Sequence, residues 1–195
     1  MKRWLCLGLT VLCIATGLLF ISLLFSPAEP SYQGKRFSVW LEHLCHSPAE
    51  KADPVAVDAI EHIGTNALPC MIRMLTAKDS FIKRQAIKLA GMQSVFRIHV
   101  TEARFTREFA VTAFLLYGAQ AQPAVPSLVE ILKTGDRYDK IESLRALAAI
   151  GPSASNAIPA ITKLLNDDDE LFLEEVRSAL SAIQTTERQS QPRVN

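Results

Sequence analysis

Two stretches of this chain decide its fold, because they repeat one pattern at an offset of 33 residues. Residues 110–132 read AVTAFLLYGAQAQPAVPSLVEIL, and residues 143–165 read SLRALAAIGPSASNAIPAITKLL. Both copies place an apolar face before a glycine, then an alanine-rich turn, then a proline that opens a second apolar face. In the alignment of the two copies, Gly118 matches Gly151 and Pro126 matches Pro159.

Each copy predicts a helix–turn–helix hairpin. Leu144, Leu147 and Ile150 recur at three-residue steps, which places them on one helical face. Glycine accepts a left-handed cap conformation that ends a helix, and proline is tolerated in the first turn of the next one. An earlier copy, with three residues fewer in its turn, carries Gly64 and Pro69. Such hairpins cannot bury both apolar faces alone, so we expect them to stack on one another.

This motif resembles HEAT repeats, particularly the bacterial kind that shares features with PBS-lyase repeats. The resemblance extends over roughly residues 38–183. It implies an all-α fold, an αα-superhelix (HEAT-like solenoid) of about four to five helical hairpins, used for protein–protein contact. The order of apolar segment, linker and repeats is also similar to membrane-anchored bacterial HEAT proteins.

The N-terminal segment predicts a membrane anchor. Residues 4–25 contain no charged side chain, and a helix of that length reaches roughly 33 Å, enough to cross a hydrocarbon core of about 30 Å. Lys2 and Arg3 precede the segment, which favours a single-pass topology with the domain outside the cell membrane, in the periplasm if the cell is Gram-negative. The alternative is a secreted domain, released by cleavage near Ala28.

These features divide the chain into four parts. We predict a transmembrane anchor or signal segment over 1–28, a linker over 29–37, a HEAT-like repeat domain over 38–184 and a disordered tail over 185–195. In the repeat domain, Cys45 and Cys70 either pair in an oxidising compartment or lie as two small buried hydrophobes on separate helices.

The charges of the chain are balanced overall but not along its length. The net charge is +1, which argues against a general nucleic-acid binder. From residue 78 to residue 107, however, seven basic residues face two acidic ones. This segment predicts a binding surface for an acidic partner, a polyanion or an anionic lipid surface, or else a solvated face. The candidate surface residues are Lys83, Arg84, Lys88, Arg97, Arg104 and Arg107.

Motifs typical of enzymes are missing from the sequence, which has no glycine-rich phosphate loop, nucleophile elbow or zinc-protease motif. His43 and His46 share a helical face, but no second ligand cluster matches them, so we predict no metal site and no cofactor. The sequence therefore predicts a membrane-anchored scaffold or adaptor that binds another protein and is not an enzyme. The alternatives are a HEAT-fold lyase or hydrolase with dispersed catalytic residues, and polyanion binding through the Lys83–Arg107 segment.

Overall fold

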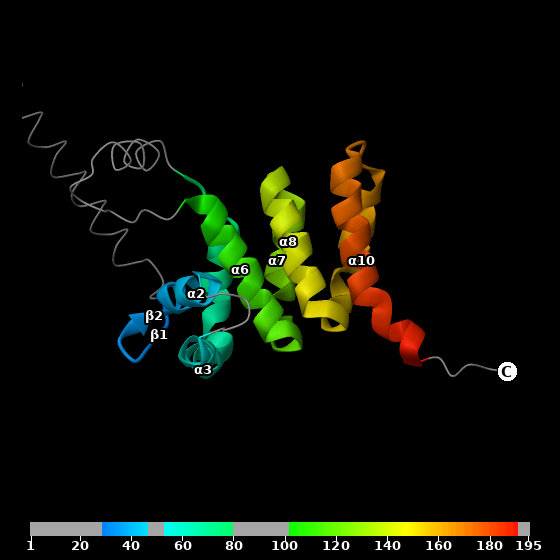
Figure 1. Ribbon diagram of the computed structural model, residues 1–195. Coiled ribbons are helices and arrows are strands. Elements are labelled where there is room, and N and C mark those ends of the chain that lie inside the picture. Colours follow the sequence, from blue (N-terminus) through cyan, green and yellow to red (C-terminus); the bar gives the residue numbers. More distant parts are fainter. Residues whose placement is uncertain (1–28, 47–52, 80–101, 191–195) are drawn as a thin grey trace, which may run out of the picture.

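The computed structural model describes residues 29–46, 53–79 and 102–190, with side chains up to residue 185. These residues form an all-α fold with one small β-hairpin at its N-terminal end (Figure 1). In chain order the elements are β1 (Ser31–Tyr32), β2 (Lys35–Arg36), α2 (Phe37–His46), α3 (Pro54–Ile63), η1 (Gly64–Ala67), α4 (Leu68–Leu75), α6 (Ala103–Tyr117), η2 (Gly118–Ala124), α7 (Val125–Thr134), α8 (Arg137–Ile150), η3 (Gly151–Ala157), α9 (Ile158–Thr162), η4 (Lys163–Asn166) and α10 (Glu170–Ser190).

Within the described residues, three pairs of helices form the predicted hairpins: α3 with α4, α6 with α7, and α8 with α9. A short 3₁₀ segment joins the two helices of each pair. Helix α8 packs against both α6 and α10, and the three lie side by side and begin at the same edge, which is uppermost in Figure 1. The buried residues of all three hairpins belong to one hydrophobic core, so the two copies at 110–132 and 143–165 share packing as expected.

The glycines that end α3, α6 and α8 adopt one backbone geometry. Gly64, Gly118 and Gly151 have φ of 57°, 48° and 68°, as a glycine cap predicts, but ψ of −148°, −126° and −143°. The left-handed helical conformation requires ψ near about +47°, so the expected cap type is wrong in ψ. Positive φ with strongly negative ψ is open almost solely to glycine, which makes these positions stricter than a left-handed cap.

The prolines lie where the sequence predicts them. Pro69, Pro126 and Pro159 occupy the first turn of α4, α7 and α9. Because the first N–H groups of a helix have no partner within it, proline costs no hydrogen bond there. The glycine ends one helix and the proline begins the next, and the 3₁₀ segment between them completes the hairpin.

Helix α4 packs against α6 as α7 packs against α8, although the two connections differ greatly in length. Gly135 and Asp136 alone separate α7 from α8, whereas residues 76–102 separate α4 from α6. Within the described residues, the two hairpins are therefore direct neighbours. The partial repeat around Ala86–Gly91 lies outside the described residues.

The segment 29–37, expected as a linker, contains an antiparallel β-hairpin. Ser31 pairs with Arg36, and Tyr32 pairs with Lys35. The turn is formed by Gln33 and Gly34, both with positive φ, as two-residue hairpin turns of this kind require. Its register is fixed from outside the hairpin, because the Trp40 indole Nε1 donates a 3.1 Å hydrogen bond to the Tyr32 carbonyl oxygen.

The last helix, α10, is capped at its start and is longer at its end than the sequence predicts. The Asp169 carboxylate accepts hydrogen bonds from the N–H groups of Leu171 and Phe172 and so caps the first turn of α10. The backbone of α10 continues to Ser190, into the segment 185–195 expected as a disordered tail. No glycine or proline interrupts residues 185–190, and each added residue of an existing helix gains one backbone hydrogen bond.

Candidate functional site

Two of the six predicted surface residues, Arg104 and Arg107, lie in the described part of the chain, in the first turns of α6. The other four, Lys83, Arg84, Lys88 and Arg97, lie outside the described residues. Arg104 and Arg107 line a cavity of about 440 Å³, here called the edge groove, between the beginnings of α6 and α8. Its lining consists of Lys78, Asp79, Glu102, Ala103, Arg104, Arg107, Asp136, Tyr138 and Asp139.

Arg104 is exposed but paired. Its Nε lies 2.8 Å from a carboxylate oxygen of Glu102, and its guanidinium group lies 4.5 Å from the ring centre of Phe105. A positive charge at a helix N-terminus is unfavourable because the helix dipole is positive there, and the carboxylate of Glu102 offsets this.

Arg107 holds neighbouring elements together. Its guanidinium donates a 2.8 Å hydrogen bond to the carbonyl oxygen of Ala77, which follows α4, and lies 5.9 Å from the ring centre of Tyr138 on α8. Its Nε is buried without a hydrogen-bond partner among the described residues. Arg107 thus connects three successive elements of the stack instead of presenting an open charge.

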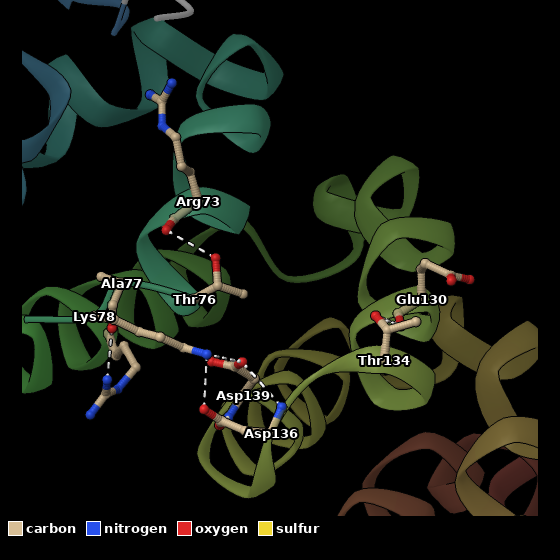
Figure 2. A network of polar contacts seen from close by, with 9 residues as sticks. Arg73, Thr76, Ala77, Lys78, Glu130, Thr134, Asp136 and Asp139 are labelled. Carbon is tan, nitrogen blue, oxygen red and sulfur yellow. Dashed lines mark hydrogen bonds and ion pairs between the residues drawn. The ribbon is translucent and has the colours of Figure 1, made fainter. Parts of the chain in front are cut away.

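Lys78 makes the most extensive ion pair in the edge groove. Figure 2 shows its side chain reaching from the segment after α4 to Asp136 and Asp139 at the start of α8, with Nζ–oxygen distances of 2.9 and 3.2 Å. These hydrogen bonds raise the pKa of the Lys78 ammonium group. The pKa of the Asp136 carboxyl lies below its ordinary value, first because it accepts the Asp139 N–H and then because of Lys78.

Asp136 and Asp139 also form a capping box at the start of α8. Asp136 accepts the Asp139 N–H at 3.0 Å, and Asp139 accepts the Asp136 N–H at 3.2 Å. Sequence reasoning missed both residues as members of the site, although their spacing of three residues before an apolar run is a recognisable capping signal. Glu102 and Asp79 also line the groove, so its carboxylates make it mixed in charge, whereas the sequence predicts a basic surface.

The core beneath the edge groove is polar where the repeat is otherwise apolar. Asp139 is 5% exposed and Ser143 is fully buried, whereas the residues one repeat later, Phe172 and Val176, belong to the hydrophobic core. Asp139 Oδ1 and Ser143 Oγ have no hydrogen-bond partner among the described residues. Buried polar atoms without partners cost stability, so these two positions of α8 are weak points of the core.

The two cysteines of the repeat domain are both free. Cys70 is buried, as expected, whereas Cys45 is exposed, so the expectation of two buried cysteines is wrong for Cys45. Partial burial raises the pKa of both thiols, which disfavours the reactive thiolate form.

Neither a metal cluster nor a membrane span occurs in the described ranges. Within residues 29–46, 53–79 and 102–190, no group of three or more His, Cys, Asp or Glu side chains is arranged to hold a metal ion. In the same ranges no helix combines the length and apolar character that crossing a membrane requires. The predicted anchor, residues 4–25, lies outside them.

Comparison with known proteins assigns the chain to no established group. No protein-family model matches it. No curated protein and no solved structure matches it either.

Proposed function

We propose that this protein is a HEAT-like repeat scaffold that binds another protein at a membrane. The observation that carries the proposal is the repetition of one hairpin geometry: three glycines with the same unusual backbone conformation and three prolines in matching first turns, within one core. Repeated hairpins that share a core form an extended rigid surface, which is the usual means by which helical repeat proteins bind partners.

Rigidity is the physical advantage of such a scaffold. A partner that docks on a preorganised stack pays little conformational entropy on the scaffold side, so more of the contact energy appears as affinity. Cross-links between successive elements support this view, because Arg137 pairs with Asp167 at 2.9 Å and Arg145 pairs with Glu175 on α10. The first pair joins the start of α8 to the segment before α10, and the second joins the middle of α8 to α10.

The membrane tether is the second part of the proposal, and it depends on residues 4–25. The domain faces outside the cell membrane, in the periplasm of a Gram-negative cell, or is secreted after cleavage near Ala28. Protease treatment of intact spheroplasts tests this topology: we expect residues 29–195 to be digested. Protection of the domain in intact spheroplasts contradicts the proposed topology.

The partner-binding surface is proposed around the basic segment, whose candidate residues are Lys83, Arg84, Lys88, Arg97, Arg104 and Arg107. The test is affinity capture of the full chain from detergent extracts after mild cross-linking. We compare the wild type with the triple variant Lys83→Glu, Arg84→Glu and Arg97→Glu. The matched control reverses three charges elsewhere, at Lys133, Lys163 and Arg177.

We expect a defined partner protein to be captured by the wild type and the control and lost from the basic-segment variant. Capture that is equal in all three proteins contradicts the proposed surface. Capture that persists while a turnover activity of the chain collapses favours the enzyme alternative over the scaffold.

A further inference from the structure

A second cavity, here called the C-edge pocket, lies between α3 and the last turn of α6, at the opposite end of α6 from the edge groove. Figure 1 shows the two ends of α6. Its volume is about 280 Å³. Cavities that enclose a whole small-molecule ligand measure about 300–1,000 Å³, so the size of this one suits a single side chain or a small group. Its lining consists of Val57, Ile60, Glu61, Leu116, Tyr117 and Gln120.

The wall of the C-edge pocket departs from the repeat. Leu116 is 47% exposed and its neighbour Leu115 is 64% exposed, although both are large aliphatic residues. Counted back from the helix-ending glycine, the same two positions hold Glu61 and His62 in the α3 hairpin and alanines in the α8 hairpin. The hairpin fold therefore does not require leucine here. Exposed apolar side chains around a concavity are characteristic of binding surfaces.

The floor of the C-edge pocket is fixed by a buried hydrogen bond. The Tyr117 hydroxyl donates to the Ile60 carbonyl oxygen at 2.7 Å and joins the ends of α6 and α3. Because this contact uses the hydroxyl, the polar end of Tyr117 already has its partner, and the buried Ile60 and Tyr117 side chains close the bottom of the pocket. The floor of the pocket is therefore already formed, and Leu116 supplies its exposed apolar wall.

The rim of the C-edge pocket is acidic. Glu61 lines it, and Asp58 lies one helical turn earlier on the same face of α3. Both carboxylates are exposed, and no basic side chain of the described residues forms an ion pair with either. An acidic rim favours a ligand with positive charge next to its apolar group and disfavours an anionic lipid surface.

We propose that the C-edge pocket receives one apolar side chain of a partner polypeptide that carries basic residues on either side of it. The apolar side chain packs between Leu116 and Tyr117, and the basic residues lie near Glu61 and Asp58. This inference rests on the proposed scaffold function and adds to it a second contact surface, at the end of α6 away from the basic segment, and the chemistry of the polypeptide segment that binds there.

The test uses the full chain in detergent and two fluorescein-labelled peptides as probes. The peptides are identical except that a central leucine is flanked by arginines in one and by glutamates in the other. Fluorescence polarisation measures their binding to the wild type. We expect saturable binding of the arginine peptide, at least severalfold tighter than that of the glutamate peptide.

Two variants assign the binding to this pocket. Leu116→Asp is expected to weaken binding of the arginine peptide by about tenfold or more, because one apolar contact is lost and a charge is added. Glu61→Lys is expected to reduce or reverse the preference between the two peptides. The matched control is Leu171→Asp, at a leucine 76% exposed on α10, and it leaves binding unchanged. Circular dichroism confirms that all three variants fold.

The experiments distinguish failure of the pocket proposal from failure of the proposed scaffold function. The pocket proposal is wrong if neither peptide binds, if both bind the wild type equally, or if Leu116→Asp binds as the wild type does. If the cross-linking experiment still captures a protein partner in any of these cases, the scaffold function stands without this pocket. If the arginine peptide binds as expected but no partner is captured at the membrane, the proposed scaffold function fails and the pocket remains.

Discussion

The Tyr117 hydroxyl and the Gly64 N–H group both donate to one atom, the carbonyl oxygen of Ile60. The glycine bond ends α3, and the tyrosine bond ties that end to α6, which begins 40 residues after Ile63. A single carbonyl group thus joins the cap of one hairpin to the first helix of the next. Tyr117 is only 5% exposed, so water cannot easily replace the hydrogen bond of its hydroxyl.

Replacement Tyr117→Phe removes this tie and keeps the ring. The Ile60 carbonyl oxygen retains its bond from Gly64, so we expect a loss of about 0.5–1.5 kcal/mol in the free energy of unfolding. Urea unfolding followed by circular dichroism measures it. The matched control is Tyr138→Phe, whose ring is exposed, and it should change stability by less than about 0.5 kcal/mol. Equal effects of the two replacements contradict the structural role of the Tyr117 hydroxyl.

The same tyrosine predicts how stability depends on alkaline pH. Burial raises the pKa of Tyr117 from 10.0 to about 12. Between these values the unfolded chain releases the tyrosine proton and the folded chain keeps it, so ionisation favours unfolding as pH rises from 10 toward 12. The wild type should lose more stability over this window than Tyr117→Phe. Parallel pH profiles of the two proteins would rule out a raised pKa at this position.

The backbone of Gly151 distinguishes two kinds of helix cap. A left-handed cap accepts asparagine more readily than alanine, whereas a backbone with φ of 68° and ψ of −143° favours neither over the other. We therefore expect Gly151→Asn and Gly151→Ala to cost similar amounts, on the order of 1–3 kcal/mol in the free energy of unfolding. Chemical denaturation measures both. A Gly151→Asn protein as stable as the wild type would indicate a left-handed cap instead.

Ser143 offers a stabilising change. Its buried hydroxyl has no partner in the described part of the chain, and the residue one repeat earlier is Ala110. Ser143→Ala removes an unsatisfied polar atom and should raise the free energy of unfolding by about 1 kcal/mol. Ser178→Ala, at an exposed position of α10, is the control for the intrinsic helix propensity of alanine. A Ser143→Ala protein less stable than the wild type would show that the hydroxyl has a partner.

Lys78 should contribute to stability because it pairs with the buried carboxylate of Asp139. Lys78→Ala strands the buried carboxylate of Asp139 without its positive partner, so the melting temperature should fall. In the wild type, high salt should reproduce part of the loss, since Lys78 itself is exposed. Lys133→Ala, which breaks a surface ion pair with Glu130, is the control and should have little effect. In the double variant Lys78→Ala with Asp139→Asn, the penalty should shrink; full additivity would argue against the pairing.

The hairpins were predictable because their information is local. Gly151 and Pro159 restrict their own backbone, so their spacing predicts where one helix ends and the next begins. The β-hairpin was missed because its turn, Gln33-Gly34, is a weaker signal than Asn-Gly, and because Trp40 stabilises it from outside the strands. An element is thus easier to predict when its own residues restrict the backbone than when a distant residue stabilises it.

The edge groove was less predictable because it depends on contacts between distant residues. The sequence shows that Arg107 belongs to a basic segment, but not that the Ala77 carbonyl oxygen, 30 residues earlier, accepts its hydrogen bond. Nor does it show that Lys78 pairs with Asp136 and Asp139. Asp139 and Ser143 stand out only after alignment with Phe172 and Val176, and their burial depends on the packing of α8 against its neighbouring helices. The charges counted along the chain do not determine the charge of a surface, because Asp136 and Asp139 come to Lys78 from a distant part of the sequence.

The direct packing of α4 on α6 has a consequence for engineering. The Asp79 carboxylate accepts the Ala103 N–H at 3.0 Å, so the chain departs and re-enters at adjoining points of one edge. A backbone cut within residues 80–101 would then yield two fragments whose complementary apolar faces are already matched. Co-expressed, they should reassemble without a peptide link, which makes this position a natural place to build a split reporter.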